Sequence, residues 1–163
     1  MEQGSETLSS DGMNEAATYL QEILDEVADG IGIEAEVQVR EVDDTLVGEF
    51  VGEDLGLLIG HHGQTIDAIQ HLAYRILFRR IERPMKVVVD AAGYRDRRAV
   101  ALKATADQAA EAAVHDGRPV ALEAMSALER KVVHEHLKGR HDVETYSEGQ
   151  EPDRRLVVAP VVS

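Results

Sequence analysis

Apolar residues recur along the chain at spacings that predict an alternation of helices and strands. From residue 13 an apolar stripe with a period near 3.6 predicts an amphipathic helix, for which Gly30 and Gly32 supply stop signals. Alternating apolar and polar positions over residues 33–39 predict a half-buried strand, and the extended pattern of residues 46–51 predicts a second one. Asp43-Asp44 is a turn signal between them, so we expect a hairpin.

Two consecutive helices are predicted around a glycine-containing loop. Residues 55–59 form a short apolar run that Asp54 can cap, and a strong apolar stripe follows the loop and ends near residue 80. Residues 85–89 are typical of a strand. The predicted order over residues 13–90 is therefore α-β-β-α-α-β.

The second half of the chain predicts a smaller module. It contains an alanine-rich helix, a short strand, another helix and a hairpin, over residues 94–115, 120–122, 124–138, 143–147 and 155–159. Residues 1–12 are polar, acidic and without periodicity, which is typical of a disordered tail. We therefore expect an α+β protein with a tail at residues 1–12, one domain at 13–91 and an α-β-α-β-β domain at 92–163.

The loop Gly60-His61-His62-Gly63 is a candidate binding site. Two glycines three residues apart let the backbone turn sharply and let a ligand approach closely. The first N–H groups of the following helix point into the same loop, where they favour an anion. An ordinary connection between two helices would also use these glycines. The histidines, with His71, suggest a metal site, but adjacent residues seldom point the same way, so we expect no metal.

Composition excludes several classes of function. The 163 residues contain no cysteine, which removes disulfides, thiolate zinc sites and cysteine nucleophiles. Neither a membrane-spanning apolar run nor a secretion signal is present in the sequence, so we expect a cytoplasmic protein. No catalytic motif is recognisable, and we expect no enzyme, no cofactor and no small-molecule substrate.

The charge of the chain is strongly asymmetric. The formal net charge of −14 argues at first against nucleic acid, which binds through cationic contacts. However, residues 1–53 have a net charge of −14, residues 54–98 of +3 and residues 99–163 of −3. The glycine loop therefore lies in the only net-basic third, where the local potential favours an anionic ligand.

The predicted element order, with glycines between consecutive helices, resembles the type II K-homology (KH) fold, whose G-x-x-G loop clamps about four unpaired nucleotides. The run LIGHHGQTIDAIQHL is similar to the corresponding run of the Jag/KhpB family, the SpoIIIJ-associated RNA-binding proteins. Arg130 and His134 match the Arg-x-x-x-His signature of the R-three-H domain, a single-stranded nucleic-acid-binding module. Residues 145–155 are similar to the family's acidic-Gly-Glu-Pro-x-Arg-Arg segment. The resemblance covers about residues 14–160.

The resemblance implies a non-catalytic, cytoplasmic RNA chaperone or post-transcriptional regulator, with a family role in cell elongation and envelope regulation. It implies single-stranded RNA, or single-stranded DNA, as the ligand, and a small single-KH protein as a partner. Because side chains alternate along a strand, only one of Arg154 and Arg155 can face the Arg130 side. The residues expected to bind nucleic acid are Ile59, Gly60, His61, His62, Gly63, Gln64, Thr65, Ile66, Arg130, His134, Arg154 and Arg155.

Two departures from the family pattern leave alternatives open. Many members have lysine or arginine inside the glycine loop, where this chain has His61 and His62, and histidine is mostly neutral near pH 7. Longer members carry an additional N-terminal domain, and nothing in this sequence corresponds to it. The alternative function is a protein-interaction scaffold with a degenerate KH loop. At the second site, the structural alternative is an exposed pair in which Arg130 is bridged to Glu148.

Overall fold

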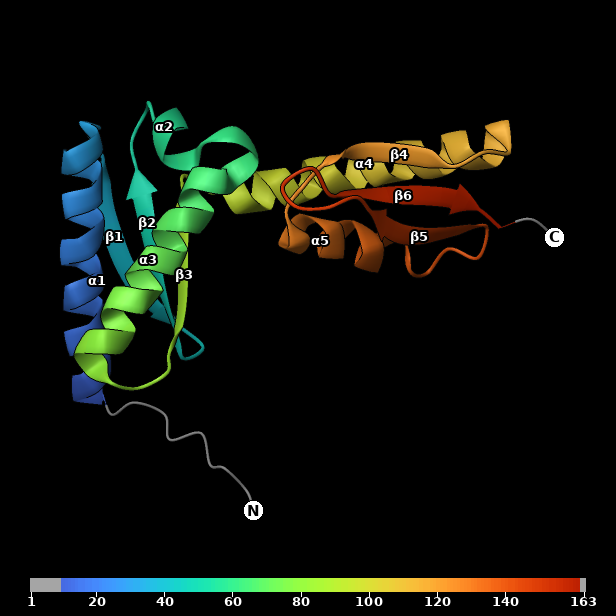
Figure 1. Cartoon of the computed structure of the whole chain (residues 1–163). Helices are drawn as coiled ribbons and strands as arrows, with labels where there is room; N and C mark the ends of the chain where they lie inside the picture. The colour runs from blue at the N-terminus through green and yellow to red at the C-terminus, as the bar shows by residue number, and fades with distance from the viewer. Residues whose placement is uncertain (1–9, 162–163) are drawn as a thin grey trace, which may run out of the picture. The chain divides into compact units, whose positions relative to one another are not determined.

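The computed structural model describes residues 10–161, and the chain divides into two compact units, Met1–Tyr94 and Arg95–Ser163 (Figure 1). The division lies close to the domain boundary expected at residue 91. Residues 1–9, most of the predicted tail, lie outside the described residues. Residues 10–12, which the sequence pattern assigned to the same tail, instead form the start of the first helix.

The first unit has the α-β-β-α-α-β order expected of a type II KH domain. Its elements are α1 (Ser10–Ile31), β1 (Glu36–Val42), β2 (Thr45–Val51), α2 (Gly56–Ile59), the 3₁₀ turn η1 (His61–Gly63), α3 (Gln64–Ile81) and β3 (Lys86–Ala91). The sheet has the order β1-β2-β3, with β1 antiparallel and β3 parallel to β2. Helices α1 and α3 contact each other and the sheet, and Figure 1 shows α3 crossing the strands beside α1.

One apolar core joins these helices to the sheet. Leu20 and Leu24 of α1, Phe50 of β2 and Leu77 of α3 are fully buried in it. Each buried side chain of this size contributes about 1.5–3 kcal/mol through removal of apolar surface from water. Leu58 is buried in the same core, so the short helix α2 and the glycine loop that follows it are anchored to the domain.

The ends of several elements differ from the predicted ones. Helix α1 continues through Gly30, the first of the two predicted stop signals, to Ile31; the second, Gly32, follows the helix with a φ of 79° that suits glycine. The expected hairpin is confirmed, and its turn at Asp43-Asp44 has φ values of 47° and 58°, as in the primed turns that match strand twist. The prediction that Asp54 caps α2 is wrong: the N-cap residue is Leu55, which makes no side-chain capping bond.

The second unit has the expected α-β-α-β-β order. Its elements are α4 (Tyr94–Asp116), β4 (Val120–Ala124), α5 (Ala127–Leu137), β5 (Val143–Glu148) and β6 (Arg155–Pro160). Strand β6 is central and antiparallel to both neighbours, in the order β4-β6-β5. The alanines of α4 are buried against Leu156 and Val158 of β6 in a second apolar core, which explains why this helix is rich in small residues.

Helix α5 begins later than its apolar pattern predicted. Ala124 is the last residue of β4 and pairs with Arg155, so it cannot start the helix predicted from that position. Ser126 instead caps the helix in a capping box: its Oγ accepts the N–H of Glu129 at 3.3 Å, and the Glu129 carboxylate accepts the N–H of Ser126 at 3.0 Å. Arg98 donates to Glu129 at 2.7 Å and thereby joins α4 to the start of α5.

Gly48 is a close-packed position on β2 that generates a stability prediction. A Cβ atom at Gly48 would overlap Cδ1 of Leu24 and lie 3.4 Å from Cδ2 of Leu20, and both leucines are fully buried. We expect Gly48→Ala to lower the free energy of unfolding by about 1–3 kcal/mol, because an added methyl group must displace packed neighbours. Urea denaturation of the full chain measures this. Gly139→Ala is the matched control, since no atom lies within 4 Å of its Cβ position; equal losses in the two variants would contradict the prediction.

Candidate nucleic-acid interface

The connection between α2 and α3 is a tight turn with left-handed backbone. The N–H of Gly60 donates to the carbonyl of Gly56 at 2.9 Å and ends α2. Gly60, His62 and Gly63 have φ values of 73°, 51° and 80°. The N-cap residue of α3 is Gly63, and no side chain caps this helix. The N–H of Gln64 donates to the carbonyl of His61, and no side chain caps the N–H groups that follow it, an arrangement that attracts anions.

Close neighbours also require glycine at both ends of the turn. A Cβ atom at Gly60 would overlap the side chain of Thr65, and a Cβ atom at Gly63 would lie 2.8 Å from Cε1 of Tyr94. Tyr94 is itself partly buried against the first core, so it supports the turn from inside the domain. A larger residue at either glycine would disturb the path of the backbone. Crowding by Thr65 and Tyr94 and the positive φ values are therefore two separate reasons for glycine at these positions.

The expected side chains of this site differ in their exposure. His61 and Gln64 are exposed. The half-buried ones are Ile59, His62 and Thr65. Ile66 is fully buried in the first core, so it does not line a surface on which a base could pack. The physical reason is its position on α3, where it faces the core in line with Ile69.

The two histidines stack at the tip of the turn. Their ring centroids are 3.9 Å apart and the ring planes differ by 28°. His62 holds the left-handed conformation, with φ 51° and ψ 30°, which is uncommon for a residue other than glycine. Among the described residues, no group of three or more His, Cys, Asp or Glu side chains is placed to hold a metal ion.

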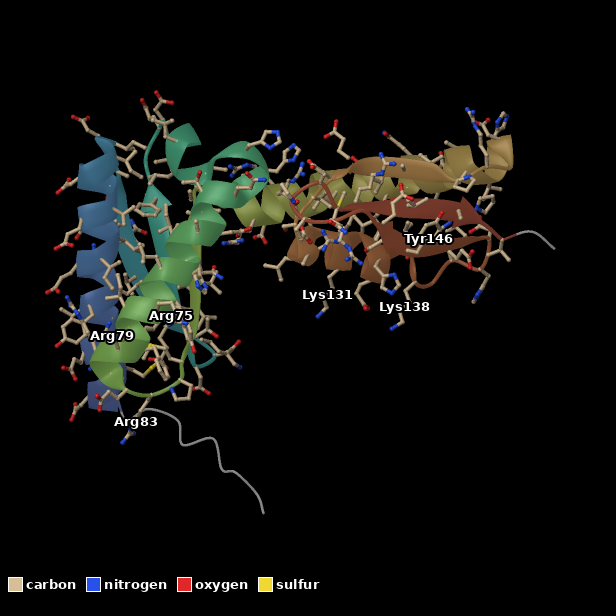
Figure 2. The ribbon with its side chains drawn as sticks, in the orientation of Figure 1. Arg75, Arg79, Arg83, Lys131, Lys138 and Tyr146 are labelled. Atoms are coloured by element: carbon tan, nitrogen blue, oxygen red, sulfur yellow. The ribbon has the colours of Figure 1, made fainter. Side chains whose placement is uncertain are left out.

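Helix α3 presents positive charge along its exposed side. Figure 2 shows Arg75 and Arg79 projecting from α3 and Arg83 beyond its end, and all three are exposed. Arg80 instead turns towards α1, where its guanidinium lies 3.5 Å from a carboxylate oxygen of Glu22 and 4.7 Å from the ring centroid of Tyr19. The exposed side of α3 therefore keeps three positive charges.

Arg130 is held by its own chain at the second predicted site. Its side chain is only 10% exposed. One guanidinium nitrogen donates to the carbonyl of Met125 at 2.7 Å, with a longer contact of 3.5 Å to the carbonyl of Arg154. The other donates to the carboxylate of Glu151 at 2.6 Å. The alternative of an exposed Arg130 bridged to Glu148 is therefore wrong. Arg130 links the start of α5 to the turn between β5 and β6.

Arg155, the first residue of β6, and Arg154, which precedes it, have different surroundings. Arg155 pairs with Glu148 of β5 at 2.7 Å. Leu156 lies in the second core, so alternation along the strand directs Arg155 away from that core, whereas Arg154 precedes the strand and is half-buried. The Nε of Arg154 is buried and has no hydrogen-bond partner within residues 10–161. Arg155 is therefore neutralised by a carboxylate of its own chain, whereas no such ion pair is found for Arg154 among the described residues.

His134 lies one helical turn after Arg130 and is exposed, with its Nδ1 2.6 Å from Oγ1 of Thr145. Sequence analysis missed two cations beside it. Lys131 and Lys138 are both exposed, and Figure 2 shows them projecting from the same side of α5. Lys131 lies three residues before His134 and Lys138 four residues after it. This spacing could have identified both from the sequence, because residues three or four apart share a helix face. Lys138 is 3.9 Å from Glu135.

The two units match the two modules that the sequence resembles. A family model described as the KH domain of KhpA/KhpB matches residues 17–91, and the model of the R-three-H domain matches residues 100–160. The first interval lies in the first unit and the second lies in the second unit. No helix among the described residues is both long enough and apolar enough to cross a membrane.

Curated relatives named RNA-binding protein KhpB match over both modules. The one from Bacillus subtilis is 34% identical over 151 residues, which are 91% of this chain and 71% of the relative. The one from Clostridium symbiosum is 30% identical over 146 residues, which are 90% of this chain and 65% of the relative. The one from Lactiplantibacillus plantarum is 43% identical over 104 residues, 64% of this chain but 32% of the relative, so this chain spans only part of its length. With a KH domain followed by an R-three-H domain, the chain belongs to the KhpB family.

Proposed function

We propose that the chain binds single-stranded RNA, and that the turn at residues 60–63 grips the sugar-phosphate backbone. The observation that supports this most is the uncapped start of α3 behind a turn in which neither glycine can carry a side chain. Backbone N–H groups there can donate to phosphate oxygens at close range. Half-buried Ile59 and Thr65 border the turn and would contact the sugar or base. Gln64 is exposed at the first position of α3 and would donate a further hydrogen bond.

The charge on the first domain supports an anionic ligand. Arg75, Arg79 and Arg83 lie along the exposed side and end of α3. Helix α1, in contrast, contains acids and no lysine or arginine. Phosphate is attracted to α3 and repelled by α1, so the fields of both helices restrict where RNA can bind on this domain.

The proposed second contact lies on the R-three-H domain. Lys131 and His134 share a face of α5, Lys138 follows its last residue, and the carbonyl of Arg154 lies 3.5 Å from the guanidinium of Arg130 on the same helix. Arg130 has a supporting role in this proposal, because its guanidinium donates to Met125 and Glu151 and holds the turn that precedes Arg154. Two modest contacts on one chain bind a long RNA more tightly than either does alone, through their effective concentration.

The family resemblance supports a more specific biological proposal. The chain would act as a non-catalytic RNA chaperone or post-transcriptional regulator in the cytoplasm, in pathways of cell elongation and envelope control. The relatives from three bacteria are named as RNA-binding proteins, which is consistent with binding rather than catalysis. Binding of unpaired nucleotides through backbone contacts would suit single-stranded DNA as well as RNA, so competition between the two is the measurement that assigns the ligand.

A protein-interaction scaffold is the second candidate function. Leu72 is 52% exposed and Phe78 is 43% exposed, at the two edges of the face of α3 that carries Arg75 and Arg79. Exposed apolar side chains together on one helix are typical of a contact surface. The partner that the family resemblance implies is a small single-KH protein. Gel filtration and RNA titration of the same preparation separate the candidates: a complex or oligomer without RNA affinity favours the scaffold.

The glycine turn generates the first test. We expect the double variant His61→Asp/His62→Asp to bind single-stranded RNA more than about tenfold more weakly, because two carboxylates repel the phosphates that the turn would hold. Aspartate tolerates the left-handed conformation of His62, so the fold should persist. Fluorescence anisotropy with a labelled oligonucleotide at fixed salt measures the affinity.

The control for that test is His61→Asn/His62→Asn. Asparagine has the shape of aspartate without its charge and also tolerates left-handed backbone. This variant should bind RNA more tightly than the aspartate variant. If the aspartate variant binds as well as the unaltered chain, the turn at residues 60–63 is not the site.

Arg154 and Arg155 provide a matched pair for the second site. We expect Arg154→Ala to weaken RNA binding and to flatten the dependence of log affinity on log salt by about 0.7, the value for one lost phosphate contact on a single strand. Arg155→Ala should leave the slope unchanged, because Glu148 already neutralises that side chain. Titrations at several salt concentrations measure both slopes. Equal slopes in the two variants would show that Arg154 does not contact phosphate.

A further inference from the structure

The stacked pair His61 and His62 can make a different contact with a ligand from that made by a cationic loop. Lysine or arginine at these positions would present a fixed positive charge, whereas the two imidazoles present an aromatic face. We propose that the ring of His61, backed by that of His62, is a stacking platform for one unpaired nucleobase of the RNA. The inference rests on the proposed binding of RNA backbone by residues 60–63 and adds a base contact to it.

The geometry of the pair supports a preformed platform. The ring centroids are 3.9 Å apart with 28° between the planes, so one face of each ring is already covered by the other. His61 is exposed, and its ring lies on that of the half-buried His62. A stacked ring has few rotamers left to lose, so binding a base to it costs less conformational entropy than binding to a free side chain.

The backbone beneath the pair is fixed as well. Thr65 fills the space at one glycine and Tyr94 fills it at the other, 2.8 Å from where a Cβ atom of Gly63 would lie. His62 holds its left-handed conformation between them. The rings therefore project from a turn whose shape is set by the core of the domain. A platform on such a support keeps one orientation relative to the backbone N–H groups of α3.

The chemistry of the ligand follows from that of the ring. Proteins that recognise single-stranded RNA stack its bases on aromatic side chains, histidine included. Stacking tolerates every base because each has a π face, and it adds no phosphate contact. The platform would therefore hold a base next to the gripped backbone with little sequence preference. It would change affinity without changing the salt dependence of binding.

Four variants of the full chain test the platform with a single-stranded RNA oligonucleotide. We expect His61→Ala to weaken binding by about 5- to 150-fold, the range that corresponds to replacing a stacked aromatic residue by alanine. His61→Phe keeps an aromatic face and should bind within about threefold of the unaltered chain, whereas His61→Lys introduces a fixed cation without an aromatic face and should bind more weakly than His61→Phe. The control is His141→Ala, which removes an exposed histidine of the second unit that belongs to neither proposed contact, and it should change nothing.

A second measurement reports stacking directly. An oligonucleotide containing the fluorescent base 2-aminopurine should lose fluorescence on binding the unaltered chain and His61→Phe, and should lose less on binding His61→Ala. The platform is overturned if His61→Lys restores affinity and His61→Phe does not, or if His61→Ala binds normally. In either case a weak His61→Asp/His62→Asp variant would still support backbone binding by the turn. If the unaltered chain binds no RNA, the proposed function fails together with the platform.

Discussion

The turn at residues 60–63 depends on the absence of a side chain at each of its ends. Thr65 occupies the space next to Gly60 and Tyr94 the space next to Gly63, and both glycines have positive φ. His62 adopts a left-handed conformation that costs on the order of 1 kcal/mol or more for a residue with a Cβ atom. The buried Leu58 before the turn and Ile66 after it fix the two helices that meet there. The same packing that demands glycine therefore fixes the path of the backbone, with Gly63 buried, Gly60 and His62 half-buried and His61 exposed.

The charge of the chain is compatible with this site because electrostatic fields in water are local. At physiological ionic strength, interactions between exposed charges are largely screened beyond about 8 Å. The acids of α1 therefore act mainly on a ligand that approaches α1 itself. Where the two helices meet, Arg80 is placed against Glu22 and Tyr19, so the acids of α1 are partly neutralised at that contact. A net charge of −14 is thus a poor guide to what binds at one face.

The order of elements could be predicted from the sequence because apolar periodicity reports which face of each element is buried. The ends could not, since they depend on pairing partners: Ala124 is in a strand because it pairs with Arg155, and the capping box at Ser126 then starts α5. For the site, the glycine positions were recoverable from their spacing. The burial of Ile66 and the partner of Arg130 required the three-dimensional structure, because both depend on contacts distant in the sequence.

The Arg-x-x-x-His pair illustrates why a motif need not have one role. Burying a guanidinium is costly unless its donors are satisfied, and Arg130 satisfies them with the Met125 carbonyl and the Glu151 carboxylate. A phosphate could bind this arginine only by replacing a 2.6 Å charged hydrogen bond that the chain already makes. His134 and Arg154 have no such internal carboxylate among the ion pairs of the described residues. The buried cation of the motif therefore holds its own chain together, and His134 and Arg154 are the neighbours that would contact an anionic ligand under the proposed function.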